Sequence, residues 1–193
     1  MSGVSRETSA KLTLFRELVI DENQRQNLVS PSTLADFDTR HLDDATQLAA
    51  LGKEGSWCDV GSGAGLPGIV IALVTGAPMT LIEPRRLRAD FLRRAVRELG
   101  LDVRVSEHKA ERVPDHFNNI TARAVAPLDR LFAITEHLAQ RGTRWILPKG
   151  RNVQKELAAA QQSWQGSFSL VPSRTGDGAM IVVAEGVRRR GKR

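Results

Sequence analysis

A glycine-rich segment in the first half of the chain constrains its fold more than any other feature. Glycines alternate with other residues in the stretch Trp57-Cys58-Asp59-Val60-Gly61-Ser62-Gly63-Ala64-Gly65-Leu66-Pro67-Gly68. The apolar run before the glycines predicts a strand, and the apolar run after them predicts a helix. Glycines at such a junction let the chain turn tightly and let a ligand approach the backbone. The segment therefore predicts an α/β fold with a ligand at this turn.

Short apolar runs and amphipathic stretches alternate along the chain from Ser56 onward. The clearest helix is predicted from Arg86 to Leu99, where Leu87, Phe91 and Ala95 recur at a spacing of four residues. Alternation of strands and helices predicts a mostly parallel sheet with helices on both faces. The seven predicted strands are Trp57–Val60, Met79–Ile82, Val103–Ser106, Ile120–Val125, Arg144–Leu147, Phe168–Pro172 and Met180–Glu185.

The two ends of the chain differ from this central part. Leu12, Phe15 and Val19 recur at helical spacing, so we expect a helical extension over residues 1–54 and an α/β domain over residues 55–186. No helix separates the last two predicted strands, which predicts an antiparallel hairpin. Residues 187–193 form a basic tail: the last six residues contribute +5 to a net charge of +6, which leaves +1 for the rest. Such a tail is typical of attraction to a polyanion or of solubility alone.

The cysteine content limits the disulfides and metal sites that the chain can form, and it indicates the compartment in which the protein works. Cys58 is the single cysteine, so the chain has no internal disulfide and no all-cysteine metal site, and we predict no metal and a reducing cytosol. Charged residues interrupt the apolar runs near the start, which argues against a secretory signal. The longest uncharged stretch, Val60 to Ile82, contains Pro67 and several glycines, whereas a membrane span needs about 20 mostly apolar residues. We expect a soluble cytoplasmic protein.

Three classes of ligand compete for the glycine turn. A phosphate-binding P-loop ends in Gly-Lys-Ser/Thr, but here Gly68 is followed by Ile69 and Val70, so that class is rejected. A dinucleotide turn needs the pattern G-x-G-x-x-G where the strand ends. Gly63, Gly65 and Gly68 fit that pattern, but two residues late. A nicotinamide-dependent oxidoreductase therefore remains an alternative.

S-adenosylmethionine, the third class, fits best. Its turn is typically an acidic residue, an apolar residue and then G-x-G-x-G, which the segment from Asp59 to Gly65 matches. This molecule has no pyrophosphate but carries an ammonium and a sulfonium, so an acidic residue at the turn suits its charge. Glu83 follows the second predicted strand, 22 residues after Gly61, and supplies the carboxylate expected at the ribose hydroxyls.

The side chains available for chemistry narrow the type of methyl transfer. Methylation of an exocyclic amine usually relies on an Asp/Asn-Pro-Pro-aromatic loop, and the chain has no Pro-Pro pair and no tyrosine. Methylation at carbon 5 of a pyrimidine needs a cysteine nucleophile, whereas Cys58 lies within a predicted strand. The segment from Thr121 to Pro127 offers Arg123 and no general base. This set is compatible with attack by a lone pair that carries no proton, such as guanine N7, where alignment matters more than proton removal.

Four short segments carry a resemblance to a known family. They are Arg40-His41-Leu42-Asp43-Asp44, the turn from Asp59 to Ile69 with its Gly-Leu-Pro-Gly-Ile ending, Arg123-Ala124, and Leu147-Pro148-Lys149-Gly150. In order and spacing they resemble the small-subunit (16S) ribosomal RNA guanine-N7 methyltransferase family, also called glucose-inhibited division protein B. The resemblance implies a class I S-adenosylmethionine-dependent methyltransferase fold, Rossmann-like, with an N-terminal helical extension. It also implies methylation of N7 of guanine 527 in 16S rRNA.

The resemblance and the turn together predict which residues hold the cofactor and which meet RNA. Glu83 is expected at the ribose, and Ala110 and Glu111 are expected at the adenine. Arg123 is the best candidate for a positioning residue, and no catalytic acid or base is assigned. The predicted cofactor-binding residues are Asp59, Gly61, Gly63, Gly65, Leu66, Glu83, Ala110, Glu111 and Arg123. The residues expected to meet RNA are Arg40, His41 and Lys149.

The expected partner is 16S rRNA or the small ribosomal subunit, with no membrane involved, and the chain is expected to act as a monomer. Six arginines between Arg85 and Arg97 lie on one predicted helix, which is typical either of a solvated face or of contact with RNA phosphates. A non-catalytic RNA-binding assembly factor with the same fold is a second alternative.

Overall fold

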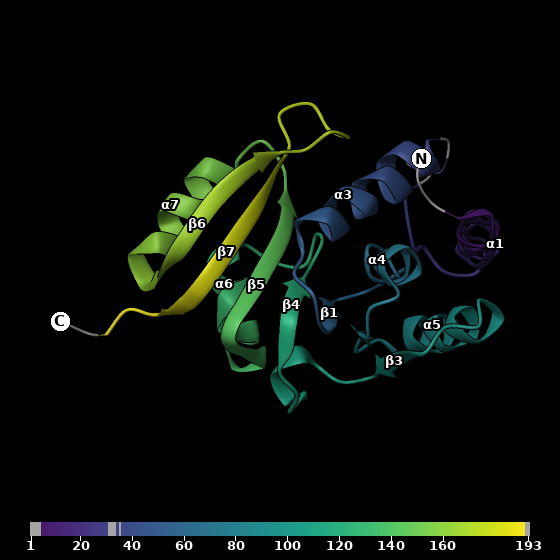
Figure 1. The fold of residues 1–193 in the computed structure, drawn as a ribbon, viewed down its shortest axis with the longest axis horizontal. Helices are drawn as coiled ribbons and strands as arrows, with labels where there is room; N and C mark the ends of the chain where they lie inside the picture. The colour runs from purple at the N-terminus through teal and green to yellow at the C-terminus, as the bar shows by residue number, and fades with distance from the viewer. Residues whose placement is uncertain (1–4, 31–33, 35, 192–193) are drawn as a thin grey trace.

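A computed structural model describes residues 5–30, 34 and 36–191 of the chain. Its centre is a seven-stranded sheet in the order β3-β2-β1-β4-β5-β7-β6 (Figure 1). Neighbouring strands from β3 to β5 are parallel, and β7 is antiparallel to both of its neighbours. The strands are β1 Trp57–Val60, β2 Met79–Ile82, β3 Val103–Ser106, β4 Phe117–Thr121, β5 Ala139–Lys149, β6 Trp164–Pro172 and β7 Met180–Arg189. This confirms the predicted parallel sheet and its closing antiparallel hairpin.

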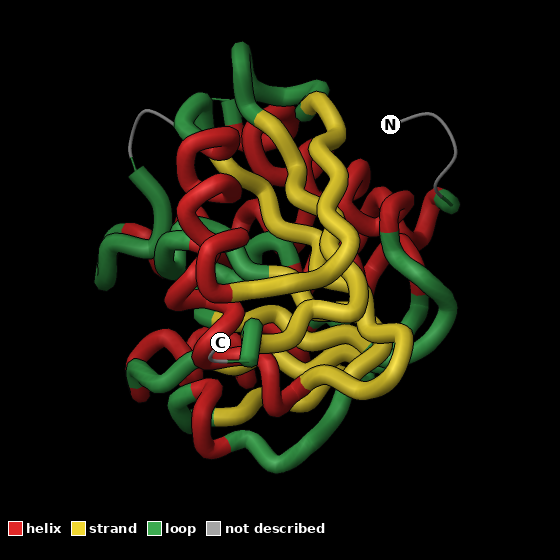
Figure 2. Tube along the Cα trace, turned by 90° about the vertical axis from the view of Figure 1, so that its left-hand side faces the viewer, coloured by secondary structure: helices red, strands yellow, loops and turns green. Residues whose placement is uncertain are grey.

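Helices cover both faces of the sheet, and Figure 2 shows the strands between them. The described helices are α1 Arg6–Asn23, the π-helix η1 Asp38–Asp43, α3 Asp44–Leu51, α4 Gly68–Thr75, α5 Arg86–Glu98, α6 Leu128–Thr135 and α7 Val153–Ser163, with short 3₁₀ turns η2 Ala110–Arg112 and η3 Glu136–Leu138. Helices α1, α3, α4 and α5 enclose one hydrophobic core, and α6 and α7 enclose the other. Successive strand residues alternate between the two: Trp145 and Leu147 belong to one core and Ile146 to the other, as side chains that point to opposite faces must.

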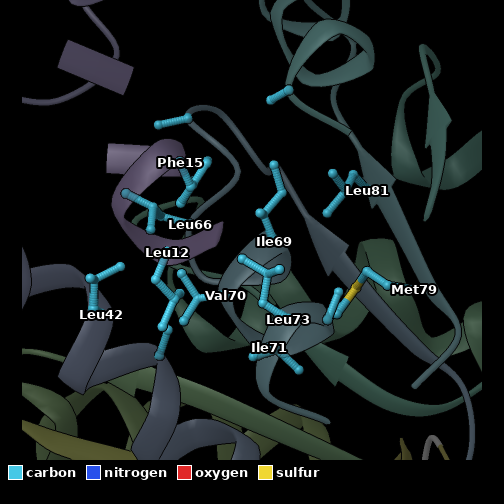
Figure 3. Packing of buried hydrophobic residues seen from close by; sticks show 14 of the residues in the cluster. Leu12, Phe15, Leu42, Leu66, Ile69, Val70, Ile71, Leu73, Met79 and Leu81 are labelled. Atoms are coloured by element: carbon cyan, nitrogen blue, oxygen red, sulfur yellow. The ribbon is translucent and has the colours of Figure 1, made fainter. Parts of the chain in front are cut away.

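The helical extension packs onto the α/β domain through α1. Leu12, Phe15 and Val19 are at most 1% exposed, as their helical spacing predicts. Figure 3 shows Leu12 and Phe15 beside Leu66 and Val70 of the glycine turn and α4. Burial of an apolar side chain of this size stabilises the folded state by about 1.5–3 kcal/mol. The extension is therefore an integral part of the core and supports the glycine turn from outside.

The structure corrects the predicted course of several segments. The fourth, fifth and sixth strands begin earlier than predicted, at Phe117, Ala139 and Trp164. The fourth strand ends at Thr121 rather than Val125, because Ala124 has a φ of +56°, which a strand residue does not adopt. Leu87 is 71% exposed, so it does not share the buried face of α5 with Phe91 and Ala95. Strand β7 continues through Arg189 and pairs with Trp164, so residues 187–189 of the predicted tail lie in the sheet.

Candidate active site

A cleft opens at the carboxyl end of the sheet between β1 and β4, where the strand order reverses. Ligands of open α/β sheets bind at this topological switch point. The cleft has a volume of about 350 Å³, within the range of small-molecule sites. Its lining residues are Leu28, Gly61, Ser62, Gly63, Ala64, Leu66, Glu83, Pro84, Arg85, Arg88, Arg123, Ala124 and Val125.

The glycine turn forms one wall of this cleft and is held by the end of β2. The Gly61 N–H donates to the Ile82 carbonyl at 2.8 Å, and the Gly63 N–H donates to Glu83 Oε2 at 2.9 Å. Gly63 has a φ of +55°, which favours glycine. A Cβ built on Gly63 would make only ordinary van der Waals contacts, the nearest at 3.7 Å with Arg88 Nη1. The turn is thus fixed in shape and leaves room for a ligand against its backbone.

Glu83 lies where the sequence predicts the ribose carboxylate. It is only 3% exposed, and its two oxygens accept hydrogen bonds from the backbone N–H groups of Gly63 and Arg85, each at 2.9 Å. A carboxylate has about four acceptor positions, so Glu83 can accept ribose hydroxyls as well. The same side chain therefore shapes the turn and can bind its ligand.

Asp59 lies beneath the glycine turn instead of in the cleft lining. Its Oδ2 accepts a hydrogen bond from the Gly68 N–H at 3.1 Å, and its buried Oδ1 has no hydrogen-bond partner among the described residues. Burial raises the pKa of Asp59 from 3.8 to about 7, although the Gly68 and Ser62 hydrogen bonds and Arg123 oppose that rise. A Cβ on Gly68 would approach Leu81 to 2.4 Å, so glycine lets α4 begin directly against β2 and this carboxylate.

The charges around the cleft suit S-adenosylmethionine. Glu83 and the buried Asp59 supply negative charge near the turn, which suits the sulfonium and ammonium groups. Arg88 lines the same cleft and suits the carboxylate of the methionine part. The unpartnered Asp59 Oδ1 is a buried acceptor, which a nearby cation would stabilise in its ionised form. The residues present therefore fit this cofactor.

A second pocket of about 340 Å³ adjoins the cofactor cleft, and Arg123 and Ala124 line both. Residues from four parts of the chain form it: the start of α3, the segment after β4, the end of β5, and the loop between β6 and β7. They are Asp44, Arg123, Ala124, Pro148, Lys149, Gly150, Ser173, Thr175, Gly176, Ala179 and Met180. The two cavities therefore meet at Arg123.

Arg123 is held in place by groups from the helical extension. Its Nη1 lies 2.9 Å from His41 Nδ1 and 3.9 Å from Asp44 Oδ2. A guanidinium only donates hydrogen bonds, so His41 Nδ1 is the acceptor of this bond. Burial lowers the pKa of Arg123, while the charges of Asp44 and Asp59 oppose that change. The guanidinium thus remains a cation at the boundary of the two cavities.

Lys149 braces the segment that carries Arg123. Its Nζ donates to the Ala126 carbonyl at 2.7 Å and to Glu156 Oε1 at 2.6 Å. The same Glu156 oxygen accepts a hydrogen bond from the Leu128 N–H at the start of α6. Lys149 also lines the second pocket. It can therefore contact a ligand there while it keeps its hydrogen bonds to Ala126 and Glu156.

The structure brings some of the predicted site residues together and separates others. Gly61, Gly63, Leu66, Glu83 and Arg123 line the cofactor cleft, whereas Asp59, Gly65, Ala110 and Glu111 do not line it. Ala110 is buried in η2 and its carbonyl lies 3.1 Å from His137 Nε2, while Glu111 is exposed. Arg40 lies in η1, and its side chain is outside the described part of the structure.

Sequence reasoning missed several residues of the two cavities. Arg85 and Arg88 line the cofactor cleft, and only their position just after Glu83 could have indicated it. Ser173 and Thr175 line the second pocket, and no local pattern marks them. Cys58 is fully buried, and burial together with Asp59 raises its thiol pKa, which agrees with its rejection as a nucleophile. Within residues 5–30, 34 and 36–191, no His, Cys, Asp and Glu side chains form a group of three that could hold a metal ion, and no helix is long and apolar enough to cross a bilayer.

The fold and the cofactor cleft define a class I S-adenosylmethionine-dependent methyltransferase. The fold is similar to a mutant of MtNAS solved in complex with S-adenosylmethionine, with a TM-score of 0.60 and 20% identity over 92% of this chain and 75% of that one. The family model described as rRNA small subunit methyltransferase G matches residues 8–174. The chain belongs to that family.

The sequences of curated relatives match nearly the whole chain. The ribosomal RNA small subunit methyltransferase G of Sphingopyxis alaskensis is 45% identical, covering 97% of this chain and 84% of that protein. The protein of the same name from Gluconobacter oxydans is 40% identical, covering 98% of this chain and 99% of its own length. The chain is thus an rRNA methyltransferase with S-adenosylmethionine as its cofactor, which confirms the predicted family, enzyme class and cofactor.

Proposed function

We propose that this enzyme methylates N7 of guanine 527 in 16S rRNA. One observation carries this proposal: the cofactor cleft and the second pocket share Arg123 and Ala124. A base held in the second pocket would therefore border the methyl donor. Guanine N7 has a lone pair and no proton, so the transfer needs alignment of donor and acceptor rather than a general base.

The chain's own residues bind and align the two reactants. The turn at Gly61 and Gly63 supports the cofactor, and Glu83 accepts hydrogen bonds from its ribose. S-adenosylmethionine supplies a methyl group on a positively charged sulfur, which leaves as a neutral thioether. Arg123, fixed by His41 at 2.9 Å, positions the target base where the two cavities meet.

The substrate is a structured RNA from which the target base must be exposed. An enzyme that modifies a base takes it out of its stack into a pocket. Arg85, which lines the cleft, and Arg86 beside it, with 84% of its side chain exposed, are suited to RNA phosphates. We infer that the enzyme acts as a monomer in the cytoplasm, on 16S rRNA or the small subunit.

The test is transfer of a tritiated methyl group to small subunits and to free 16S rRNA. We expect incorporation at one guanine, which becomes sensitive to borohydride reduction and aniline cleavage because N7 methylation labilises the base. Replacing that guanine by 7-deazaguanine should abolish incorporation. Methylation elsewhere on the base would contradict the proposal.

Two variants connect this activity to the cofactor cleft. Glu83→Ala should lower incorporation at subsaturating cofactor by at least about 100-fold, because it removes a buried carboxylate that binds both the turn and the ribose. Glu54→Ala, at an exposed acidic residue outside both cavities, is the matched control and should behave as the wild type. A wild-type protein that binds RNA but transfers no methyl group to any RNA state would support the assembly-factor alternative.

A further inference from the structure

Asp44 is a buried charged residue in the second pocket to which the proposed methyl transfer assigns no role. It is 8% exposed, and it lies at the start of α3. Its Oδ1 accepts hydrogen bonds from Gln47 Nε2 at 3.0 Å and from Thr175 Oγ1 at 2.9 Å. No described residue donates a hydrogen bond to its Oδ2, whose nearest cation is Arg123 Nη1 at 3.9 Å. One oxygen of this carboxylate is thus fixed, and the other remains available to a ligand.

A network of side chains sets the orientation of this carboxylate. Gln47 also donates to Ser173 Oγ at 3.1 Å, and its Oε1 accepts from the Arg174 N–H at 2.9 Å. These bonds connect α3 to the loop between β6 and β7, which is distant in sequence. Because both donors to Oδ1 are held by this network, Asp44 cannot rotate without breaking several hydrogen bonds. The pocket therefore presents a pre-oriented acceptor beside the pre-oriented donor Arg123.

The pairing edges of guanine and adenine differ in the order of donors and acceptors. Guanine presents the acceptor O6 followed by the donors N1–H and the N2 amine. Adenine presents the N6 amine as a donor followed by the acceptor N1. Arg123 followed by Asp44 complements the guanine order and opposes the adenine order at both positions, and unpaired buried polar groups discriminate strongly between ligands.

We propose that Asp44, together with Arg123, selects guanine as the target base by binding its pairing edge in the second pocket. Around the guanine perimeter the order is N7, O6, N1 and N2. This order matches the sequence of cofactor cleft, Arg123 and Asp44 in the structure, because Arg123 lines both cavities. With O6 on Arg123 and the N1–N2 donors on Asp44 Oδ2, N7 faces the cofactor cleft. This assignment rests on the proposed N7 transfer and adds the group that recognises the base.

Asp44 also acts on the transition state. As the bond from methyl carbon to N7 forms and the bond from carbon to sulfur breaks, sulfur takes the electron pair and the purine becomes a cation. The proton stays on N1, which becomes more acidic as the ring gains charge. Its hydrogen bond to the Asp44 carboxylate therefore strengthens during transfer, and an interaction that is stronger in the transition state raises kcat.

The test compares guanine, inosine and adenine at the target nucleotide of otherwise identical small-subunit RNA. For the wild type we expect kcat/KM to fall by about 10-fold with inosine, which lacks the N2 amine, and by at least about 100-fold with adenine. Equal rates on guanine and adenine would overturn the proposal without any variant.

Asp44→Asn is the direct variant. The two donors to Oδ1 select the amide oxygen at that position, so the amide NH₂ replaces Oδ2 and faces the pocket. We expect kcat/KM on guanine to fall by about 100-fold and the guanine-to-adenine ratio to fall by at least about 30-fold. This ratio is measured within one preparation, so it does not depend on the folded fraction. Asp43→Asn, at an exposed neighbour, is the matched control and should keep the wild-type ratio.

The two proposals fail in different ways. A variant Asp44→Asn that loses rate but keeps the wild-type ratio would leave N7 methylation intact and overturn base selection by Asp44. A wild-type protein that transfers no methyl group to N7 of any guanine would overturn both proposals.

Discussion

The cofactor cleft and the second pocket lie side by side but are built in different ways. The polar side of the cleft comes from short runs directly after β1, β2 and β4, and backbone N–H groups hold its carboxylate Glu83. The second pocket depends on side chains far apart in the chain: the residues of the Asp44–Thr175 hydrogen bond are 131 positions apart. A local motif therefore defines the first cavity, whereas the complete tertiary structure defines the second.

This difference predicts that the two cavities have separate functions. Changes in the cleft should alter cofactor affinity, and changes in the second pocket should alter the rate of transfer and the choice of base. Arg123 lines both cavities, so its variants test most directly whether the two functions are separate.

Arg123→Ala should have the largest effect among the variants that test this separation. We expect kcat to fall by about 100- to 1,000-fold, because the base loses its positioning donor, while affinity for S-adenosylhomocysteine changes by less than about 5-fold. Arg123→Lys should remain impaired, since an ammonium lacks the planar fork of the guanidinium. Single-turnover rates and calorimetric titration separate the two quantities. An affinity loss as large as the rate loss would assign Arg123 to the cleft alone.

Lys149→Met should lower the rate by about 10-fold with little change in cofactor affinity. The substitution removes the bonds to the Ala126 carbonyl and to Glu156, and it leaves the half-buried Glu156 carboxylate without its cation. The double variant Lys149→Met with Glu156→Gln should recover part of the stability, measured by thermal unfolding. No recovery would show that the stability lost in Lys149→Met does not come from the unpaired Glu156 carboxylate.

The pH dependence of cofactor binding should report the ionisation of Asp59. Burial raises the pKa of this carboxyl to about 7, so it is largely neutral below that pH and ionised above it. Because S-adenosylmethionine is cationic near its sulfur, affinity should rise several-fold from about pH 6 to about pH 8. Asp59→Asn keeps an acceptor for the Gly68 N–H and should flatten the profile. An unchanged profile in that variant would exclude Asp59 as the titrating group.

Surface arginines should give the smallest effect. Arg86 lies 3.9 Å from Asp90 and is highly exposed, whereas Arg93 forms ion pairs with Asp90 and Glu107 at 2.8 and 2.9 Å. Arg86→Gln should weaken RNA binding a few-fold and reduce its salt slope by about 1, and Arg93→Gln should change the slope less. Binding at several salt concentrations measures both. A salt slope for Arg86→Gln equal to that of the wild type would show that the N-terminal turn of α5 does not contact phosphates.

Much of the fold follows from local patterns. The predicted bounds of β1, β2 and β3 agree with the structure. β1 and β2 are fully buried strands of a parallel sheet, whereas β3 is an edge strand in which polar residues alternate with valines. The end of β4 was not predictable, since Ala122 and Val125 continue an apolar pattern while Ala124 adopts a positive φ. The exposure of Leu87 likewise depends on where α5 begins relative to the core.

The site was predictable only where its residues lie close together in the sequence. The glycine turn and Glu83 follow the spacing of a strand, a turn and a strand. Asp59 was expected at the cofactor but lies under the turn, because the direction of a side chain at the end of a strand depends on the helix packed against it. Asp44, Gln47 and Thr175 come together only through long-range contacts, and no spacing rule connects them.

A crystal structure of the protein with S-adenosylhomocysteine tests the central claim most directly. The account predicts the adenosine against the glycine turn, both ribose hydroxyls on Glu83, and the sulfur directed toward Arg123 and the second pocket. Density for the ligand elsewhere, or an empty cleft that instead takes a coenzyme with a diphosphate bridge, would contradict it.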